Sequence, residues 1–421
     1  MSENCWDVVV IGGGAAGFFS AIRLKELNPK FSIVVLEKTQ KTLSKVRISG
    51  GGRCNVTHHC LKNSDLLQQY PRGKKIIKQA VHKFNVQHTI DWFNSHGVSL
   101  KIESDGRMFP TTDSSETIAG LFEDLVDKFG IKIIRGCAVK TLVYSKGKNE
   151  YNNKYNWEIF TSAEKIMANS VVIATGGQMA WTHYQWISEL PISIIKPYPS
   201  LFTFNIQDKQ LQSLSGISVP SGAVKLIGFD SLFQGPVLIT HWGLSGPAVL
   251  KASAWAAQWI YDRNYSFQIL ISWIIAEENQ FRQQFNILVE QNAKKKIINL
   301  PLEIPNRLWQ FILWRSEINS EKIIGELTKA QKNKIIEMLL KMPFTVTGKT
   351  TFKEEFVTAG GIGEDSIDPN TLAIKQHIGL YACGEILNVD GVTGGFNFQA
   401  AWSTANLVAN SIAYSPFSEN L

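Results

Sequence analysis

The N-terminal region contains the stretch VVVIGGGAAG at residues 8–17, and this stretch decides the fold. Its apolar residues predict a buried strand, the glycines follow as Gly-x-Gly-x-x-Gly, and residues 18–27 read as a helix. A second strand is expected over residues 31–36, directly before Glu37. Strand, glycines, helix, strand and acid in this order form the fingerprint of a dinucleotide site. The glycines allow a tight turn and the approach of a pyrophosphate to the helix N-terminus, and Glu37 would accept hydrogen bonds from ribose hydroxyls. A structural glycine turn is the alternative, and the motif alone leaves FAD and NAD open.

The composition is that of a soluble globular protein. The 421 residues are 44% hydrophobic and 19% charged, which suggests two or three domains. The 43 basic and 36 acidic residues give a net charge of +7 that is spread along the chain, so a solvated basic surface explains it without nucleic acid. Five scattered cysteines without a Cys-x-x-Cys pair predict neither disulfides nor zinc, and they favour a reducing compartment such as the cytoplasm. No apolar run reaches the roughly 18 residues of a membrane span, and the N-terminus lacks a signal peptide's basic region.

A basic, glycine-rich segment, KVRISGGGRCNVTH at residues 45–58, is expected to be a loop that faces a ligand. Three consecutive glycines leave backbone N–H groups free, and cationic and short polar side chains flank them. Such a loop suits a phosphate or the edge of a flavin. A flexible surface loop is the alternative, and it explains the flanking Arg53 and Asn55 poorly.

The next part of the chain is expected to be mainly helical over residues 61–130 and to form strands from there to residue 174. Its histidines lack the spacing of metal ligands. A hairpin turn is predicted at Asn152-Asn153. The last strand, residues 170–174, opens into Thr175-Gly176-Gly177, which fits a sheet edge that passes close to the nucleotide; an ordinary tight turn is the alternative.

The middle of the chain differs in pattern from both ends. Short alternating segments separated by glycines predict a β-rich, barrel-like domain over residues 191–274, and apolar periodicity predicts a helical domain over residues 275–344. In the β-rich domain, Ser245 is expected to cap a helix that has Pro247 in its first turn. His241 is a candidate to face the substrate, although a plain helix start also explains this stretch.

The C-terminal region supplies a second anchor for a cofactor. Residues 356–362 predict a strand that runs into glycines, and residues 379–384 predict another with an acid at its exit. A glycine pair at 394–395 and a final helix follow. This order is typical of flavoproteins, in which the helix N-terminus stabilises the anionic reduced ring. An NAD-binding domain does not need a C-terminal segment to complete its site. Because residues 379–403 are expected to lie beside residues 8–17, the sequence identifies the cofactor as FAD. A routine strand–turn–helix is the alternative.

The residues predicted to bind FAD come from all of these segments. They are Gly12, Gly14, Ala15, Ala16, Gly17, Glu37, Lys38, Lys45, Ser49, Gly51, Gly52, Arg53, Asn55, Val139, Thr175, Gly176, Gly177, Gly384, Glu385, Asp390, Gly394, Gly395, Phe396 and Asn397. No catalytic acid or base is singled out by the sequence. Arg53, His241 and Glu385 are the polar candidates for a place near the flavin.

Five motifs in order resemble a known family. They are GGGAAG (12–17), ISGGGRCNVT (48–57), GRMFP (106–110), THWGLSGPA (240–248) and the glycine-rich stretch 384–403. They are similar, over nearly the whole chain, to the YhiN/BaiN-like flavoproteins, also called the aminoacetone-oxidase family of FAD-binding enzymes. The resemblance implies an α/β fold in which a glutathione-reductase-like FAD-binding Rossmann domain, residues 1–190 and 345–421, is interrupted by the β-rich and helical domains. It also implies a bacterial cytosolic flavoprotein that oxidises or reduces small organic substrates of amine or enone type.

The chain departs from this family's pattern at residues 178–186. Family members usually have a Ser-Tyr-Pro-like segment and more glycine there, whereas this chain has a bulkier, aromatic stretch. We expect this stretch to reshape the substrate pocket or its access.

The predicted function is that of an FAD-dependent oxidoreductase in which a hydride passes between flavin N5 and a small organic substrate. The sequence has one Gly-x-Gly-x-x-Gly motif, so NAD(P)H would dock transiently as the donor. The alternatives are a tRNA-modifying flavoprotein, suggested by the basic pI, and a flavin-binding regulatory protein without turnover. The expected partner is a small-molecule substrate, with no stable nucleic acid and no membrane span, and homo-oligomerisation is left open.

Overall fold

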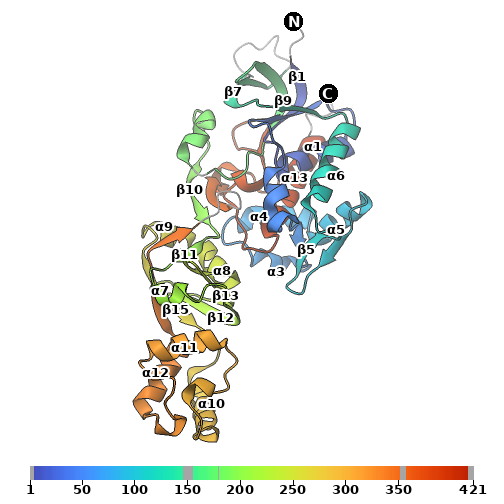
Figure 1. Cartoon of the computed structure of the whole chain (residues 1–421). Coiled ribbons are helices and arrows are strands. Elements are labelled where there is room, and N and C mark those ends of the chain that lie inside the picture. Colours follow the sequence, from blue (N-terminus) through green and yellow to red (C-terminus); the bar gives the residue numbers. More distant parts are fainter. Residues whose placement is uncertain (1–3, 146–154, 179, 351–356, 416–421) are drawn as a thin grey trace. The chain divides into compact units, whose positions relative to one another are not determined.

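The computed structural model describes residues 4–145, 155–178, 180–350 and 357–415. The chain forms two compact units. The first unit combines both ends of the chain, Met1–Ser200 and Lys353–Leu421, and the second unit is Leu201–Phe352. Figure 1 shows the two ends of the sequence, blue and red, interleaved in the first unit.

The first unit is built on a mixed sheet that has seven strands within the described residues. In order, they are β6 (Lys132–Arg135), β2 (Ile33–Glu37), β1 (Cys5–Ile11), β9 (Lys165–Ile173), β8 (Trp157–Thr161) and β7 (Val139–Tyr144), with β19 (Leu380–Ala382) also paired to β9. Strands β6, β2, β1, β9 and β19 are parallel, whereas β7, β8 and β9 form an antiparallel meander. Runs of Val, Ile and Leu in the parallel strands fit burial on both faces of the sheet.

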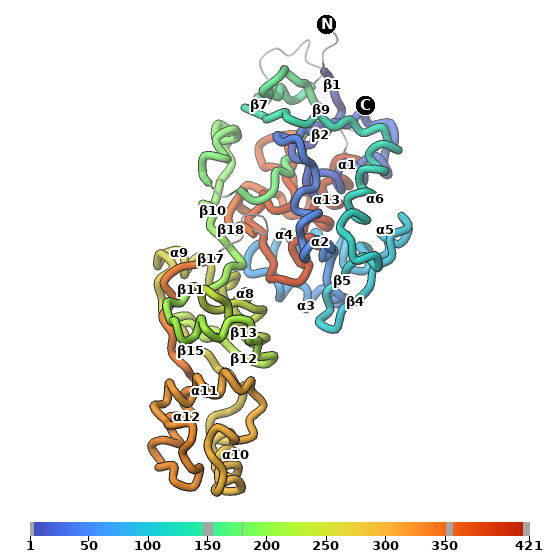
Figure 2. Tube along the Cα trace, viewed as in Figure 1, coloured from blue at the N-terminus to red at the C-terminus, as the bar shows by residue number. Residues whose placement is uncertain are grey.

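Two helices from opposite ends of the chain pack together beside this sheet. Helix α1 (Ala15–Leu27) follows β1, and α13 (Phe396–Ala413) closes the described chain. The rings of Phe19 and Trp402 lie 5.3 Å apart, and both views of the backbone show the two helices side by side (Figures 1 and 2). The remaining elements of the first unit are α2 (Ser44–Gly52), β3 (Thr57–His58), α3 (Asn63–Leu67), α4 (Lys74–Lys83), α5 (Val86–Ser95), β4 (Leu100–Ile102), β5 (Arg107–Pro110), α6 (Ser115–Lys128), η1 (Trp181–Ile187), β10 (Ile194–Ser200), β18 (Val357–Ile362), η4 (Glu364–Ser366) and η5 (Gly384–Ile386).

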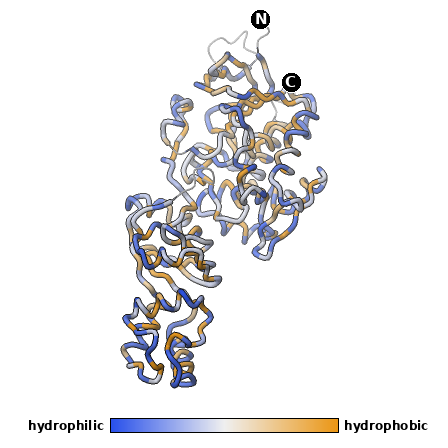
Figure 3. The backbone as a smooth tube through the Cα atoms, viewed as in Figure 1, coloured by the Kyte–Doolittle hydropathy of each residue, from blue (hydrophilic) through white to orange (hydrophobic). Residues whose placement is uncertain are grey.

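The second unit joins an antiparallel sheet to a group of helices. The strands follow the order β16 (Met342–Val346), β15 (Phe267–Ser272), β12 (Ser218–Leu226), β13 (Leu232–Thr240), β14 (Gly243–Ser245), β11 (Thr203–Asn205) and β17 (Gly348–Thr350). The helices are α7 (Lys209–Gln212), α8 (Pro247–Trp255), α9 (Ala257–Tyr261), α10 (Glu278–Gln291), η2 (Ile297–Asn299), α11 (Asn306–Arg315), η3 (Ile324–Glu326) and α12 (Lys329–Leu340). One buried cluster contains strand residues such as Phe204 and Ile269 together with helix residues such as Phe285 and Ile312. Figure 3 shows the hydrophobic segments interleaved with hydrophilic ones in both units.

Most of the expected elements are confirmed, and two expectations are wrong. The segment at 45–58 was expected to be a loop but begins as helix α2, which leaves helical geometry at Ser49 where the glycines start. Ser245 is not a helix cap, because it pairs with Leu238 in the sheet. Gly246, with a φ of +94°, takes the cap position before α8. The turn predicted at Asn152-Asn153 lies outside the described residues, and the three-domain division of the sequence stays a prediction.

Trp402 ties α13 to the rest of the first unit. Its side chain is fully buried, and its Nε1 donates a hydrogen bond to the carbonyl oxygen of Val56 at 2.9 Å. Trp402→Ala should therefore lower the free energy of unfolding by about 3–5 kcal/mol, the usual cost of removing a buried aromatic side chain. Urea unfolding followed by circular dichroism measures this change. Tyr414→Ala, which removes a side chain from a residue 75% exposed next to the same helix, should stay within about 0.5 kcal/mol. A similar loss for both variants would contradict the assignment.

Candidate cofactor site

The first anchor is the N-terminus of α1. Gly14 is its N-cap, and no side chain satisfies the first-turn N–H groups. Gly12 has a φ of +117°, and a Cβ there would lie 2.4 Å from the carbonyl oxygen of Ala174. A Cβ on Gly17 would lie 1.9 Å from the carbonyl oxygen of Gly12, whereas a Cβ on Gly14 would meet nothing within 4 Å. Packing of the protein thus requires Gly12 and Gly17, and we propose that the open space at Gly14 admits a pyrophosphate.

Glu37 holds the glycine turn in place from the end of β2. Its Oε2 accepts a hydrogen bond from the backbone N–H of Gly13 at 2.8 Å, and its Oε1 accepts one from the backbone N–H of Thr39 at 2.8 Å. The carboxylate therefore lies beside the glycine turn before α1, and its contact with ribose hydroxyls stays a prediction.

A cavity of about 350 Å³ opens at this edge of the sheet. It is lined by Ile11, Gly12, Leu36, Glu37, Lys38, Cys137, Ala138, Val139, Lys140, Thr175, Gln178, Thr182, His183, Gln185 and Trp186. Five residues of the predicted cofactor set, from four separate segments, are among them. The hydroxyl of Thr175 is buried without a hydrogen-bond partner among the described residues. A small polar ligand in the cavity would supply that partner.

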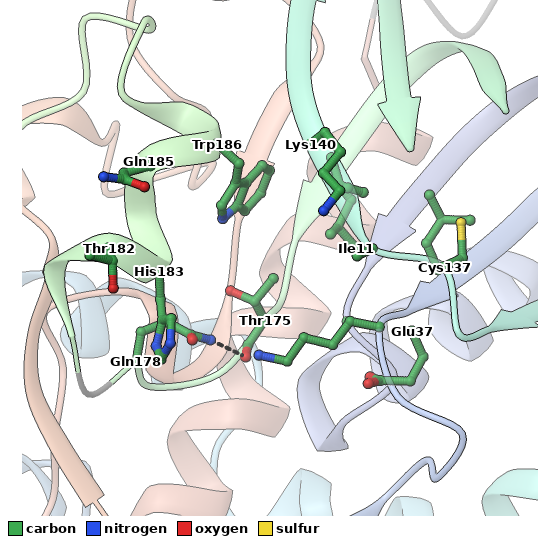
Figure 4. Close-up of a pocket in the computed structure, with 15 residues that line it drawn as sticks. Ile11, Glu37, Cys137, Lys140, Thr175, Gln178, Thr182, His183, Gln185 and Trp186 are labelled. Atoms are coloured by element: carbon green, nitrogen blue, oxygen red, sulfur yellow. Dashed lines mark hydrogen bonds between the residues drawn. The ribbon is translucent and has the colours of Figure 1, made fainter. Parts of the chain in front are cut away.

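One wall of the cavity is the aromatic stretch that departs from the family pattern. Helix η1 contributes the side chains of Thr182, His183, Gln185 and Trp186 to this wall. Figure 4 shows that the Trp186 ring and Thr175 line the same cavity. Nε2 of Gln178 donates to the carbonyl oxygen of Thr175 at 2.9 Å and links this wall to the end of β9. The sequence predicts that this stretch reshapes the substrate pocket or its access, and that stays a prediction; its four wall residues were not among the residues predicted to bind FAD.

The second anchor is the N-terminus of α13. Gly395 is its N-cap, with a φ of +93° and no side-chain cap. In the amide orientation that satisfies both of its polar atoms, Asn55 accepts a hydrogen bond from the backbone N–H of Gly395 at 3.0 Å. A Cβ on Gly384 would lie 2.7 Å from Cβ of Ala16, so this glycine lies directly against the first turn of α1. Helices α1 and α13 also pack together, so the two segments predicted from the sequence lie in one region of the first unit.

An ion pair lies between the anchors. Nζ of Lys45 is 2.7 Å from Oε2 of Glu385, and Oε1 of Glu385 accepts a hydrogen bond from the backbone N–H of Thr358 at 2.9 Å. A Cβ on Gly177 would lie 2.6 Å from the same Oε1. Two predicted residues from distant segments, Lys45 and Gly177, therefore converge on the carboxylate of a third, Glu385. Because Glu385 already has these two partners, nothing in the geometry marks it as a catalytic acid.

Several predicted residues are engaged with protein partners instead. Arg53 pairs with Glu103 at 2.6 Å and stacks over Phe109 at 4.0 Å, which ties it to the β4–β5 hairpin. The side chain of Asn397 exchanges hydrogen bonds with the backbone of Gly391. The Ser49 hydroxyl donates to its own helix, and His241 belongs to the second unit. The roles of these residues toward a cofactor stay predictions.

Asp390 takes part in a buried ion pair that the sequence did not reveal. Its side chain is fully buried, both carboxylate oxygens contact the guanidinium of Arg72, and the Ser200 hydroxyl donates to it at 2.7 Å. Asp390 is among the residues predicted to bind FAD, and that role stays a prediction. The structure shows it positioning the turn before α13, and Arg72 gave no local signal because its partner is distant in sequence.

The donor set fits FAD. Two uncapped helix N-termini favour the negative charge of a pyrophosphate and of a reduced flavin, and the acid and cavity beside α1 suit an adenosine. All five cysteines are free thiols, and burial raises the pKa of both Cys54 and Cys383 to about 12. Those two are therefore neutral thiols at pH 7 and are poor nucleophiles. We therefore assign the two-electron chemistry expected at this site to the cofactor and not to these two thiols.

Fold and site together define an FAD-binding Rossmann protein. A family model for the HI0933-like protein Rossmann domain matches residues 6–411, and the chain belongs to this family. It is an FAD-dependent oxidoreductase, as the sequence predicted. Among the described residues, no helix is long and apolar enough to cross a bilayer.

Named relatives cover the chain almost completely. A ribosomal RNA dihydrouridine synthase from Haemophilus influenzae is 30% identical over 98% of this chain and 98% of its own length. A 3-dehydro-bile acid delta(4,6)-reductase from Clostridium scindens is 25% identical over 97% of this chain and 99% of its own. Among solved structures, 3-ketosteroid delta1-dehydrogenase from Sterolibacterium denitrificans aligns with a TM-score of 0.52 and 10% identity, covering 98% of this chain and 100% of that one. At this identity the structural likeness shows the fold alone.

Glycine substitutions separate the packing role of the turn from its ligand role. Gly14→Ala should leave the stability of the apoprotein nearly unchanged and lower FAD affinity about tenfold or more, because the methyl group fills the space kept for the pyrophosphate. Gly17→Ala should destabilise the apoprotein itself, because its Cβ would overlap the Gly12 carbonyl. Thermal melts of the apoprotein and titration with FAD distinguish the two effects. If Gly14→Ala binds FAD with native affinity, the N-terminus of α1 does not bind the pyrophosphate.

Trp186 offers a test of the cavity wall. Trp186→Ala should weaken FAD binding about tenfold, or ~1.4 kcal/mol, because the cavity loses its large aromatic surface. Trp181→Ala is the matched control, since Trp181 lies in the same short helix, is 52% exposed and does not line the cavity. FAD titration of both apoproteins, followed by flavin fluorescence, measures the difference. Equal affinities for the two variants would show that η1 does not form part of the cofactor site.

Proposed function

We propose that this protein is an FAD-dependent reductase that uses NAD(P)H to saturate a C=C bond conjugated to a carbonyl, with a uridine of ribosomal RNA as its substrate. The observation that carries the proposal is the match over 98% of both chains to a relative named ribosomal RNA dihydrouridine synthase. A second protein of that name, from Escherichia coli, is 26% identical over 95% of this chain.

The names of the relatives describe one type of reaction. Dihydrouridine is uridine whose C5=C6 bond has been reduced, and that bond is conjugated to the C4 carbonyl. The double bonds of a 3-dehydro-delta(4,6) bile acid are likewise conjugated to the C3 carbonyl. In both cases a hydride would add to the carbon of the reduced double bond that lies farther from the carbonyl, and a proton would add to the nearer carbon. The overall change consumes one NAD(P)H and one proton and yields NAD(P)⁺.

The residues of the first unit would bind and orient the cofactor for this reaction. FAD, when bound, supplies the two-electron chemistry that no side chain of the site provides. The α1 N-terminus and Glu37 would hold its nucleotide half, and the α13 N-terminus would favour negative charge on its ring end. The sequence offers one dinucleotide fingerprint, which supports a donor that docks transiently. We assign no residue as the proton donor.

The two substrate classes differ in charge, because RNA is a polyanion and a bile acid carries one carboxylate. The net charge of +7 is compatible with RNA, but it is spread along the chain and does not by itself select RNA. The sequence identities to the two relatives, 30% and 25%, are too similar to decide which relative's substrate class this chain shares. A transient complex with ribosomal RNA during turnover is therefore part of the proposal.

The test is anaerobic reduction of the purified holoprotein with NADH or NADPH, followed by mixing with an unmodified ribosomal RNA transcript or a 3-oxo-delta(4) steroid acid. We expect the flavin to be reoxidised by the RNA, and nuclease digestion with mass spectrometry to find uridine that has gained two hydrogens. The Gly14→Ala variant without bound FAD is the control. Reoxidation by the steroid alone would assign the bile-acid type of substrate. A flavin that no donor reduces would contradict the whole proposal.

A further inference from the structure

Helix α4 has an exposed face made of cationic side chains. Its residues Ile76, Ile77, Ala80 and Val81 are buried, so the apolar stripe of this amphipathic helix is already used in packing. The remaining face carries Lys74, Lys75, Lys78, His82 and Lys83, all of them exposed, and the helix contains no acidic residue. Lys75, Lys78 and His82 follow one another at helical spacing and therefore point to the same side.

Several other cations of the first unit are neutralised by a nearby carboxylate. Arg47, Arg53 and Lys101 each pair with a carboxylate. Among the described residues, Lys75 and Lys78 take part in no ion pair. Residues 62–83 as a whole contain six Lys or Arg and one acid, Asp65, which is exposed on α3. The potential around Lys75 and Lys78 is therefore positive, because no carboxylate among the described residues pairs with either side chain.

The face begins beside the cofactor site. Arg72, two residues before α4, pairs with Asp390, and a Cβ on Gly73 would lie 2.3 Å from Cγ2 of Val389. The backbone N–H of Val392 donates to the carbonyl oxygen of Gln69 at 2.9 Å. The start of α4 is thus attached to the turn that leads into α13. From there its 10 residues extend the cationic face over ~15 Å.

We infer that this face of α4 binds the phosphate backbone of the RNA that presents its uridine to the site; the inference rests on the proposed function. Lysines such as Lys75 and Lys78 neutralise phosphates without reading bases, and this kind of contact positions a nucleic acid. An anionic membrane is the weaker partner, because a helix that binds membranes needs an apolar face free for insertion and that of α4 is buried. The exposed lysines and the histidine of α4 are suited to contact successive phosphates of an RNA backbone.

The test is the salt dependence of binding to a ribosomal RNA transcript. The double variant Lys75→Glu/Lys78→Glu should bind about tenfold or more weakly near physiological salt, and the slope of log K against log salt should become shallower by about 2, because two phosphate contacts are lost. Lys294→Glu/Lys295→Glu makes the same change in net charge in the second unit and should keep the native slope. FAD content, melting temperature and reduction by NAD(P)H should stay native in both double variants.

Each outcome bears on the inference. A native slope in Lys75→Glu/Lys78→Glu, or an equal loss in the control, would overturn it while leaving uridine reduction intact. If native protein binds no RNA at any salt concentration, the RNA half of the proposed function fails together with this inference. Retention of the native protein on phosphatidylserine vesicles, with no binding to RNA, would assign the face to a membrane surface instead.

Discussion

The architecture depends on how closely glycines let α1 approach its neighbours. At Gly17 a side-chain carbon would lie 1.9 Å from the carbonyl of Gly12, and at Gly384 it would lie 2.7 Å from the methyl of Ala16. Contacts this close tolerate no side chain, since protein interiors are already packed to the density of crystals. They bring the exit of β1 and the exit of β19 to one edge of the sheet. A cofactor site can therefore be assembled from opposite ends of the chain, with the second unit inserted between them.

A buried polar network fixes the direction of α13. Gln399 is fully buried, and its Oε1 accepts hydrogen bonds from the hydroxyls of Thr57 at 2.6 Å and Thr89 at 3.0 Å. Its Nε2 donates to the hydroxyl of Ser403 at 3.0 Å, which in turn donates to the carbonyl of Phe84. An amide left unsatisfied in this position would cost about 1–3 kcal/mol, so α13 cannot rotate without losing several bonds at once. The uncapped N–H groups at its start thus keep one orientation relative to β3.

The sequence predicted what is encoded locally or by fixed spacing, and it failed where distant partners decide. Glu37 was identified because strand and helix lengths determine how far it lies from the glycines. Ser245 was assigned to a cap because Ser favours that position, but pairing with Leu238 draws it into the sheet. The sequence did not predict that η1 would line the cavity beside β1 and β7, because nothing in residues 178–186 says which part of the sheet they cover. Arg72 was missed for the same reason.

The Arg72–Asp390 pair shows why such non-local partners matter to the site. Removing two charges from water costs several kcal/mol, and an ion pair recovers this only with good geometry and further hydrogen bonds. Asp390 meets both conditions, with two contacts to one guanidinium and a third from Ser200. An apolar pair of the same volume could contribute as much stability, but it would not fix an orientation. The ion pair therefore contributes a fixed geometry. The Asp390 carboxylate holds both the turn before α13 and the start of α4, so the cofactor anchor and the cationic face keep a constant position relative to each other.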